Sequence, residues 1–122
     1  MHELSHIRAL MTMAHAHAQN RRHEHAIEIY QEIMHHYKGL SPEAKQTVHG
    51  ETQKVYNTIL LSKINHLIDE AFSHIQNNNH SKAKSHYSEI KQLYSKLGKE
   101  HRAAVSDKCI KLHEKLFELT LG

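Results

Sequence analysis

The residues that could do chemistry appear at the start of the chain, where residues 2–6 read HELSH. This is the H-E-x-x-H pattern of zinc metalloproteases, in which two histidines on one helical face hold zinc and the glutamate activates a metal-bound water. The extended form of the pattern needs a glycine and a third histidine, but Ala9 and Thr12 stand at those positions. The first turn of a helix is also a poor place for a preorganised site, because helix ends fray. We therefore expect that the protein is not an enzyme and has no catalytic residues.

Histidine is the outlier of the composition, with 15 residues in a chain of 122. His2 and His6 can pair on one helical face, whereas histidines two positions apart point in different directions. Without clustered cysteine or aspartate beside them, metal binding would be surface chelation of limited selectivity. One interpretation left open is therefore a histidine-rich protein that binds, or is assembled by, a transition metal. No cofactor is expected beyond adventitious zinc or nickel. The candidate ligands are His2, His6, His15, His17, His23 and His25.

The composition predicts a single all-α domain over residues 1–122. The chain contains 4 Gly, 1 Pro and no Trp, and it is rich in residues with helix-forming tendency. Its length allows one domain with a modest core. No apolar stretch is long enough to span a bilayer, MHELSHIRAL lacks the apolar core of a secretory signal, and the one cysteine, Cys109, cannot form an internal disulfide. We expect a cytoplasmic protein without membrane contact.

The chain matches itself at an offset of 57 residues, which is the separation of Ile7 and Ile64. Without a gap, residues 7–61 lie over residues 64–118. Most recurring positions are apolar or aromatic and have helical spacing. The sequence therefore predicts a tandem duplication of one packing unit. Its predicted core comprises Cys109 and the matched pairs Ala14 and Ala71, Ala26 and Ala83, Tyr30 and Tyr87, Ile33 and Ile90, and Tyr37 and Tyr94.

Each copy is predicted to contain three helices, and the two copies share a long central one. In the first copy we expect helices at about residues 3–19 and 23–38, and a third that opens at Pro42. No strong breaker follows until about residue 76, so the third helix should run into the second copy, either as one long helix or as two with a kink. A helix that ends at Leu97 and another that follows Gly98 and ends near residue 121 complete a set of five.

The ends of these helices carry local signals. Gly39 suits the left-handed position that closes a helix. Ser41 can cap the third helix, and Pro42 is tolerated in its first turn. Asn79 or Ser81 can cap the fourth helix. These signals place the boundaries more tightly than periodicity alone.

One pattern of small and aromatic residues, L-x3-A-x11-A-x3-Y-x2-I, recurs in both copies. It occupies Leu10, Ala14, Ala26, Tyr30 and Ile33, and again Leu67, Ala71, Ala83, Tyr87 and Ile90. This pattern resembles the tetratricopeptide helical hairpin over residues 7–38 and 64–95. The chain departs from that family in having alanine at the usual glycine, a unit of 57 residues rather than 34, and an extra helix after each hairpin. The resemblance implies a scaffold that binds peptides or proteins and has no active site.

A nucleic-acid-binding interpretation is also left open. The chain has 16 basic residues against 13 acidic ones, a slim excess without a long basic run. Non-specific phosphate contact is all that this predicts, since no motif for reading bases is present. The candidate residues are the cationic turn Arg21 and Arg22 and one side of the expected fifth helix, Arg102, Lys108, Lys111 and Lys115.

The function that we predict is a non-enzymatic protein–protein interaction or self-assembly module built from helical repeats. Two copies are few for such a protein, because each repeat normally buries a face against a neighbour. We therefore expect a homo-oligomer or another protein partner. The repeated tyrosines and Cys109 are interpreted as packing residues rather than as stacking platforms or a reactive thiol.

Overall fold

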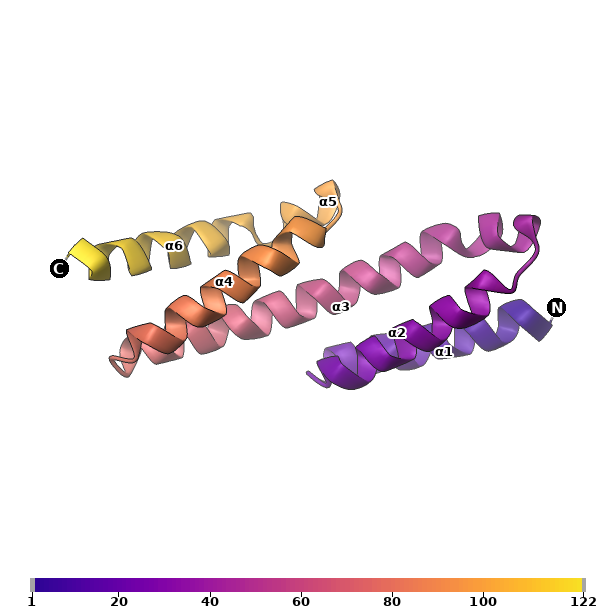
Figure 1. The fold of residues 1–122 in the computed structure, drawn as a ribbon, viewed down its shortest axis with the longest axis horizontal. Coiled ribbons are helices and arrows are strands. Elements are labelled where there is room, and N and C mark those ends of the chain that lie inside the picture. Colours follow the sequence, from indigo (N-terminus) through magenta and orange to yellow (C-terminus); the bar gives the residue numbers. More distant parts are fainter. Residues whose placement is uncertain (1, 122) are drawn as a thin grey trace. The chain divides into compact units, whose positions relative to one another are not determined.

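The computed structural model describes the backbone of residues 2–121 and the side chains of residues 4–118. Within this range the chain forms six helices and no strand (Figure 1), which confirms the all-α expectation. None of these helices combines the length and the apolar content that crossing a membrane requires. The helices are α1 (His2–Gln19), α2 (His23–Lys38), α3 (Pro42–Gln76), α4 (His80–Lys96), α5 (Lys99–Arg102) and α6 (Ser106–Leu121).

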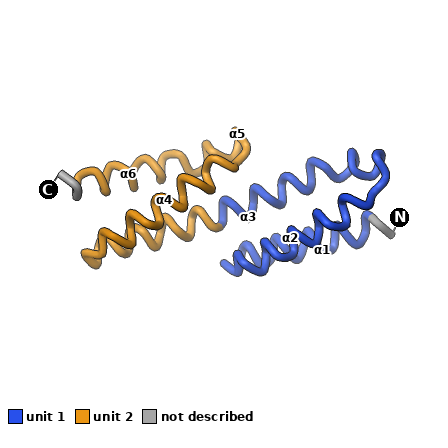
Figure 2. The backbone as a smooth tube through the Cα atoms, in the orientation of Figure 1, with its two compact units in different colours: residues 1–62 blue, residues 63–122 orange. Residues whose placement is uncertain are grey.

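The chain divides into two compact units, residues 1–62 and residues 63–122 (Figure 2). The first unit contains α1, α2 and the first part of α3, and the second contains the rest of α3 with α4, α5 and α6. Of the two alternatives for the central segment, one long helix is observed, because α3 runs without interruption for 35 residues. One helix therefore supplies residues to both units.

The prediction of five helices is wrong, because the expected last helix is two. α5 ends at Arg102, and α6 begins at Ser106. Between them, two successive amides donate to carbonyls three residues back, which is the spacing of a turn rather than of an α-helix. The Arg102 side chain also donates to the carbonyls of Ser95 and Leu97 at the end of α4. This tertiary contact ties the short α5 to α4, and helical periodicity carries no sign of it.

The caps predicted for α3 and α4 are present. The Ser41 hydroxyl accepts a hydrogen bond from the amide of Ala44 at 3.2 Å. Of the two candidates for α4, the Asn79 side chain caps it by accepting from the amide of Lys82 at 3.4 Å. Both caps satisfy a backbone amide in the first turn that has no partner within the helix.

The left-handed position predicted at Gly39 is wrong, because the φ of this residue is −86°. α2 closes instead by tightening, and the Gly39 amide donates to a carbonyl three residues back. The left-handed residues of the described chain are Arg21 and Asn78, both at φ 60°. Each lies just after a helix, and the amide of the residue that follows it donates back to a carbonyl in the last turn of that helix. The donor is Arg22 after α1, at 2.8 Å, and Asn79 after α3, at 2.7 Å.

The core of the first unit takes one apolar stripe from each of α1, α2 and α3. Ala14 of α1 and Ala26 of α2 are completely buried in it, and such small side chains let two helices approach closely. Ile7, Ile33 and Val48 are the larger buried side chains that fill the space around them. The small residues therefore set how closely α1 and α2 pack.

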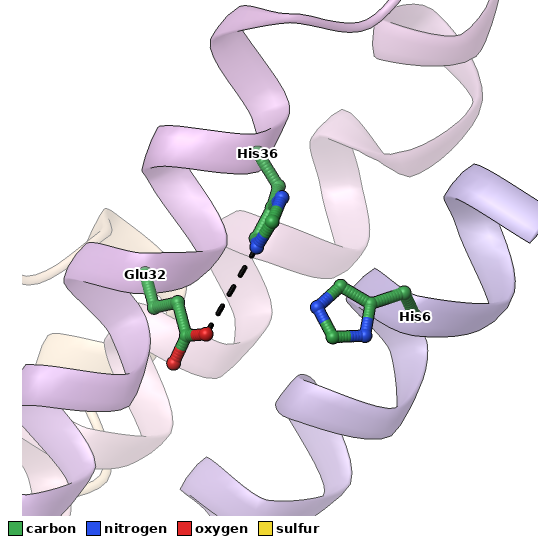
Figure 3. A group of neighbouring side chains, drawn as sticks. All are labelled: His6, Glu32 and His36. Carbon is green, nitrogen blue, oxygen red and sulfur yellow. Dashed lines mark ion pairs between the residues drawn. The ribbon is translucent and has the colours of Figure 1, made fainter.

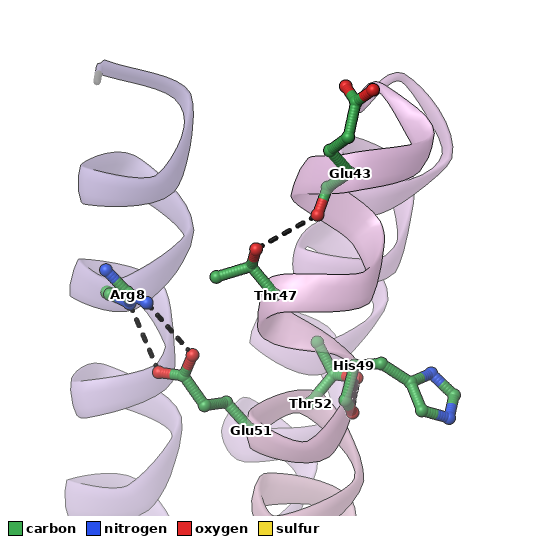
Figure 4. Close-up of polar contacts among 6 residues, drawn as sticks. All are labelled: Arg8, Glu43, Thr47, His49, Glu51 and Thr52. Atoms are coloured by element: carbon green, nitrogen blue, oxygen red, sulfur yellow. Dashed lines mark hydrogen bonds and ion pairs between the residues drawn. The ribbon is translucent and has the colours of Figure 1, made fainter.

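A two-pronged ion pair joins α1 to α3 within the first unit (Figure 4). Arg8 donates through Nε and Nη2 to the two carboxylate oxygens of Glu51, both at 3.1 Å. The hydrogen bond to Glu51 and its charge raise the pKa of Arg8. The hydroxyls of Thr47 and the buried Thr52 donate to carbonyls of α3 itself, so the polar groups on this side of the helix have partners.

The second unit buries side chains that lie 57 positions later in the sequence than those of the first. Ala71, Ala83 and Ile90 are buried, as are Ala14, Ala26 and Ile33 in the first unit. The four repeated tyrosines and Cys109 are half-buried. At the positions of Arg8 and Glu51 stand Asn65 and Lys108, and the Lys108 ammonium donates to the Asn65 side chain at 3.1 Å.

We predict that Ala26→Leu destabilises the protein by about 1–3 kcal/mol, because the larger side chain must fit into a completely buried position. Ala104→Leu is the control, since Ala104 is exposed between α5 and α6, and it should change the free energy of unfolding by less than about 0.5 kcal/mol. Urea unfolding followed by far-UV circular dichroism measures both. Equal effects of the two substitutions would contradict the role given to Ala26.

Candidate functional site

A largely apolar groove of about 460 Å³ lies between α4 and α6 in the second unit. Tyr87, Ile90 and Tyr94 line it from α4, and Cys109 and Ile110 line it from α6. Across the groove, the Tyr87 hydroxyl and His113 Nδ1 share a hydrogen bond of 2.9 Å. The groove has the apolar lining with few polar groups that is typical of a docking surface.

Three large apolar side chains of the described residues are exposed, and they lie on the first and last helices. Ile110 and Phe117 of α6 are 54% and 58% exposed, and Met13 of α1 is 50% exposed. Ile110 and Phe117 are two helical turns apart, so they share one face of α6 with His113. An exposed apolar face on a helix is a typical contact surface for another protein.

The equivalent positions of the other unit lack this exposed apolar character. Leu60 stands 57 residues before Phe117 and is only 3% exposed. The residue 57 positions before Ile110 is Gln53, and the residue 57 positions after Met13 is Glu70. The other unit therefore has a polar residue at two of these positions and a buried apolar residue at the third.

The repeated tyrosines lie at the edge of the two cores, each with an aromatic or cationic neighbour. The rings of Tyr30 and Tyr56 are tilted against each other, with centroids 5.0 Å apart. Burial raises the pKa of Tyr30 and of Tyr87, and it also raises the pKa of the Cys109 thiol above its ordinary value of 9.0. Cys109 is therefore mostly protonated at neutral pH.

The residues predicted to contact nucleic acid are divided between the two units. Arg21 and Arg22 lie in the first unit, in the turn between α1 and α2, whereas the other four lie in the second. Arg102 is on α5 rather than on the helix of the lysines, and its guanidinium carbon lies over the Tyr94 ring, 5.7 Å from the ring centre. Of the lysines on α6, Lys108 donates to Asn65 and Lys115 pairs with Glu118, while Lys111 is exposed.

The six histidines predicted as metal ligands lie in different surroundings. The side chain of His2 lies outside the described residues. His15 shares a hydrogen bond of 2.9 Å with Gln19, and the rings of His17 and His25 are 5.5 Å apart.

His23 is buried, and its Nε2 lies 2.9 Å from the Ser62 hydroxyl. That hydroxyl gives its one hydrogen to the Ala18 carbonyl, so His23 is the donor to Ser62. This chain of bonds supplies a partner to a carbonyl in the last turn of α1. The His23 Nε2 is therefore occupied by a structural hydrogen bond.

The sixth histidine, His6, meets two side chains of α2 (Figure 3). Ligand atoms of His6, Glu32 and His36 all lie within 4.8 Å of one another. The rings of His6 and His36 meet edge to face with centroids 4.7 Å apart, and His36 Nε2 lies 3.9 Å from the Glu32 carboxylate. Glu32 and His36 were not among the predicted ligands, although their spacing of four residues on one helix was a usable signal. Their meeting with His6 depends on how α1 packs on α2.

No protein-family model matches the chain, and neither does any curated protein or solved structure. The tetratricopeptide resemblance therefore rests on the spacing of its own residues.

We predict that Cys109 in the folded protein reacts more slowly with a thiol reagent than in the urea-unfolded chain at about pH 8, because only the thiolate reacts. The folded state holds the thiol proton more tightly, so the stabilisation from this group is present below pH 9.0 and is lost as the pH rises through the raised pKa. Release of the reagent's chromophore, measured against pH in both states, tests this. Cys109→Ser supplies the background, and equal rates in both states would contradict the shift.

Proposed function

We propose that this protein is a non-enzymatic helical-repeat module that assembles with copies of itself, head to tail. In this arrangement the apolar face of α6 in one copy packs on the exposed face of α1 in the next. The observation that carries the proposal is that, among the described side chains, the exposed large apolar ones lie on α1 and α6.

Contacts that recur at the same offset support a tandem duplication of one helical unit. The Lys45 ammonium lies 5.8 Å from the centre of the Tyr37 ring, and the Arg102 guanidinium lies 5.7 Å from the centre of the Tyr94 ring. Both the cation and the tyrosine of the second pair stand 57 residues after those of the first. The backbone closures after α1 and α3 also recur at this offset. The alanines of the predicted hairpin pattern are buried in both units, which supports a shared packing scheme.

A repeat protein buries an apolar face of each unit against a neighbour. Here α1 and α6 each expose apolar side chains. On α1, Ala9, Met13 and Ala16 are exposed and lie on one side, at spacings of four and three residues. On α6, the exposed apolar side chains are Ile110 and Phe117. Packing one face on the other removes both from water, which is the main driving force for association.

The two faces also differ in a way that favours a head-to-tail contact over a symmetric one. The α1 face is mostly small, with alanines on either side of Met13, whereas the α6 face presents the large side chains Ile110 and Phe117. Large side chains pack better against small ones than against each other. One chain therefore carries both halves of the contact, so the partner of each face is a second copy of the same chain. A contact between unlike faces can propagate along a filament or close into a ring.

We predict that Met13→Glu and Phe117→Glu each weaken self-association by about 30-fold or more, because each places a charge in the buried centre of the contact. Mixing the two variants should restore a one-to-one dimer, since Met13→Glu retains a native α6 face and Phe117→Glu retains a native α1 face. Size-exclusion chromatography with light scattering, in the presence of EDTA, measures the masses. The mixed dimer should not grow further, because its two free faces both carry a glutamate.

His15→Glu and Lys111→Glu are the matched controls, because they change the charge of exposed positions on other sides of the same two helices. Both should keep the mass of the wild-type assembly, and circular dichroism should show unchanged helix content for all variants. A wild-type protein that stays monomeric at high concentration would overturn the proposal. Assembly of Met13→Glu at the wild-type level would instead show that α6 pairs with itself.

A further inference from the structure

The cluster of His6, Glu32 and His36 has a plain counterpart in the second unit. The residues 57 positions later are Lys63, Glu89 and Leu93. Lys63 and Glu89 form an ordinary ion pair there, with the ammonium 3.3 Å from the carboxylate.

The first unit therefore keeps the glutamate and has a histidine in place of both the lysine and the leucine. An ion pair alone would not require these two changes. They place two imidazole nitrogens beside one carboxylate, so that three metal-ligating groups stand where the second unit has a simple ion pair.

The donor set suits a divalent transition ion. Two imidazole nitrogens and one carboxylate oxygen are ligands of zinc, cobalt, nickel and copper, and three protein ligands leave an open position for water. The ligand atoms now lie up to 4.8 Å from one another. Metal–ligand bonds of about 2.0–2.2 Å require them to come closer together than this. Since His6 and Glu32 are exposed, their side chains can rotate to close this distance without disturbing the core.

The surroundings provide space and a favourable charge. A hollow of about 330 Å³ lined by His6, His36, Gly39 and Leu40 adjoins the cluster, which leaves room for water on the open side of an ion. The His35 ring lies 5.9 Å from that of His36. The Glu32 carboxylate offsets part of the charge of a divalent cation, and the neutral imidazoles add none.

We propose that His6, Glu32 and His36 bind one divalent ion of the zinc class and thereby join α1 to α2 within the first unit. Glu32 and His36 are one turn apart on α2, and His6 supplies the third ligand from α1. The ion acts as a structural link between two helices of one chain. His6 stands two helical turns before Met13 and shares its side of α1, but this inference does not require the proposed assembly, because all three ligands belong to the first unit of one chain.

The test replaces the cluster with its counterpart from the second unit. The double variant His6→Lys and His36→Leu recreates the lysine, glutamate and leucine that the chain already uses at the equivalent positions. Zinc titration against a chromophoric chelator should show one site fewer than in the untagged wild-type protein. Zinc in excess should raise the wild-type Tm by about 4 °C and leave that of the double variant unchanged.

Two further variants make the result specific to this cluster. Glu32→Gln keeps the shape of its side chain but removes the charge, and should weaken the site by about tenfold or more. His15→Gln with His25→Gln removes the same number of histidines from other candidate positions and should leave the site intact. Bound cobalt(II), as a probe, should show the visible absorption of a low-coordinate site only where the cluster is intact. Equal zinc stoichiometry in the wild type and the His6→Lys, His36→Leu variant would overturn the proposal.

Discussion

Close packing of helices around small side chains is the constraint on which the rest of the structure depends. Ala14 and Ala26 are completely buried in the core that α1, α2 and α3 share, and Ala71 and Ala83 are buried in the second unit. A larger side chain at such a position would push the helices apart, because protein interiors have little free volume. The close approach of α1 and α2 also brings His6 of α1 within reach of two side chains of α2.

The two units keep this packing while their surfaces differ. The Arg8 and Glu51 ion pair of the first unit has an amide and an ammonium at the equivalent positions of the second. Core positions are restricted because each must match its neighbours in volume, whereas an exposed pair contributes little to stability and can change freely. New binding properties are therefore expected at the surface of such a unit. The histidine cluster of the first unit and the apolar face of α6 are both of this kind.

Local signals in the sequence predicted most of the helical elements but not the contacts between them. The bounds of α2 and the Ser41 cap follow from periodicity and capping chemistry, which act within a few residues, whereas the same signals left open whether α3 is one helix or two. The break between α5 and α6 accompanies the contact of Arg102 with the end of α4, and the left-handed closure falls on Arg21 rather than Gly39. Likewise, Glu32 and His36 are a visible pair on one helix, but their approach to His6 depends on the packing of two helices.

The position of His6 gives the HELSH pattern a different meaning from the one that its letters indicate. In a metalloprotease, both histidines of the pattern face a cleft in which the substrate reaches the metal. Here His6 faces α2, and its neighbours in space are Glu32 and His36. An ion held there would fix α1 to α2, and α1 also carries Met13, two turns further along the helix. If α1 packs on another copy, an ion that already orders this helix lowers the entropy lost on association. Metal binding and assembly would then favour each other, although they use different side chains of α1.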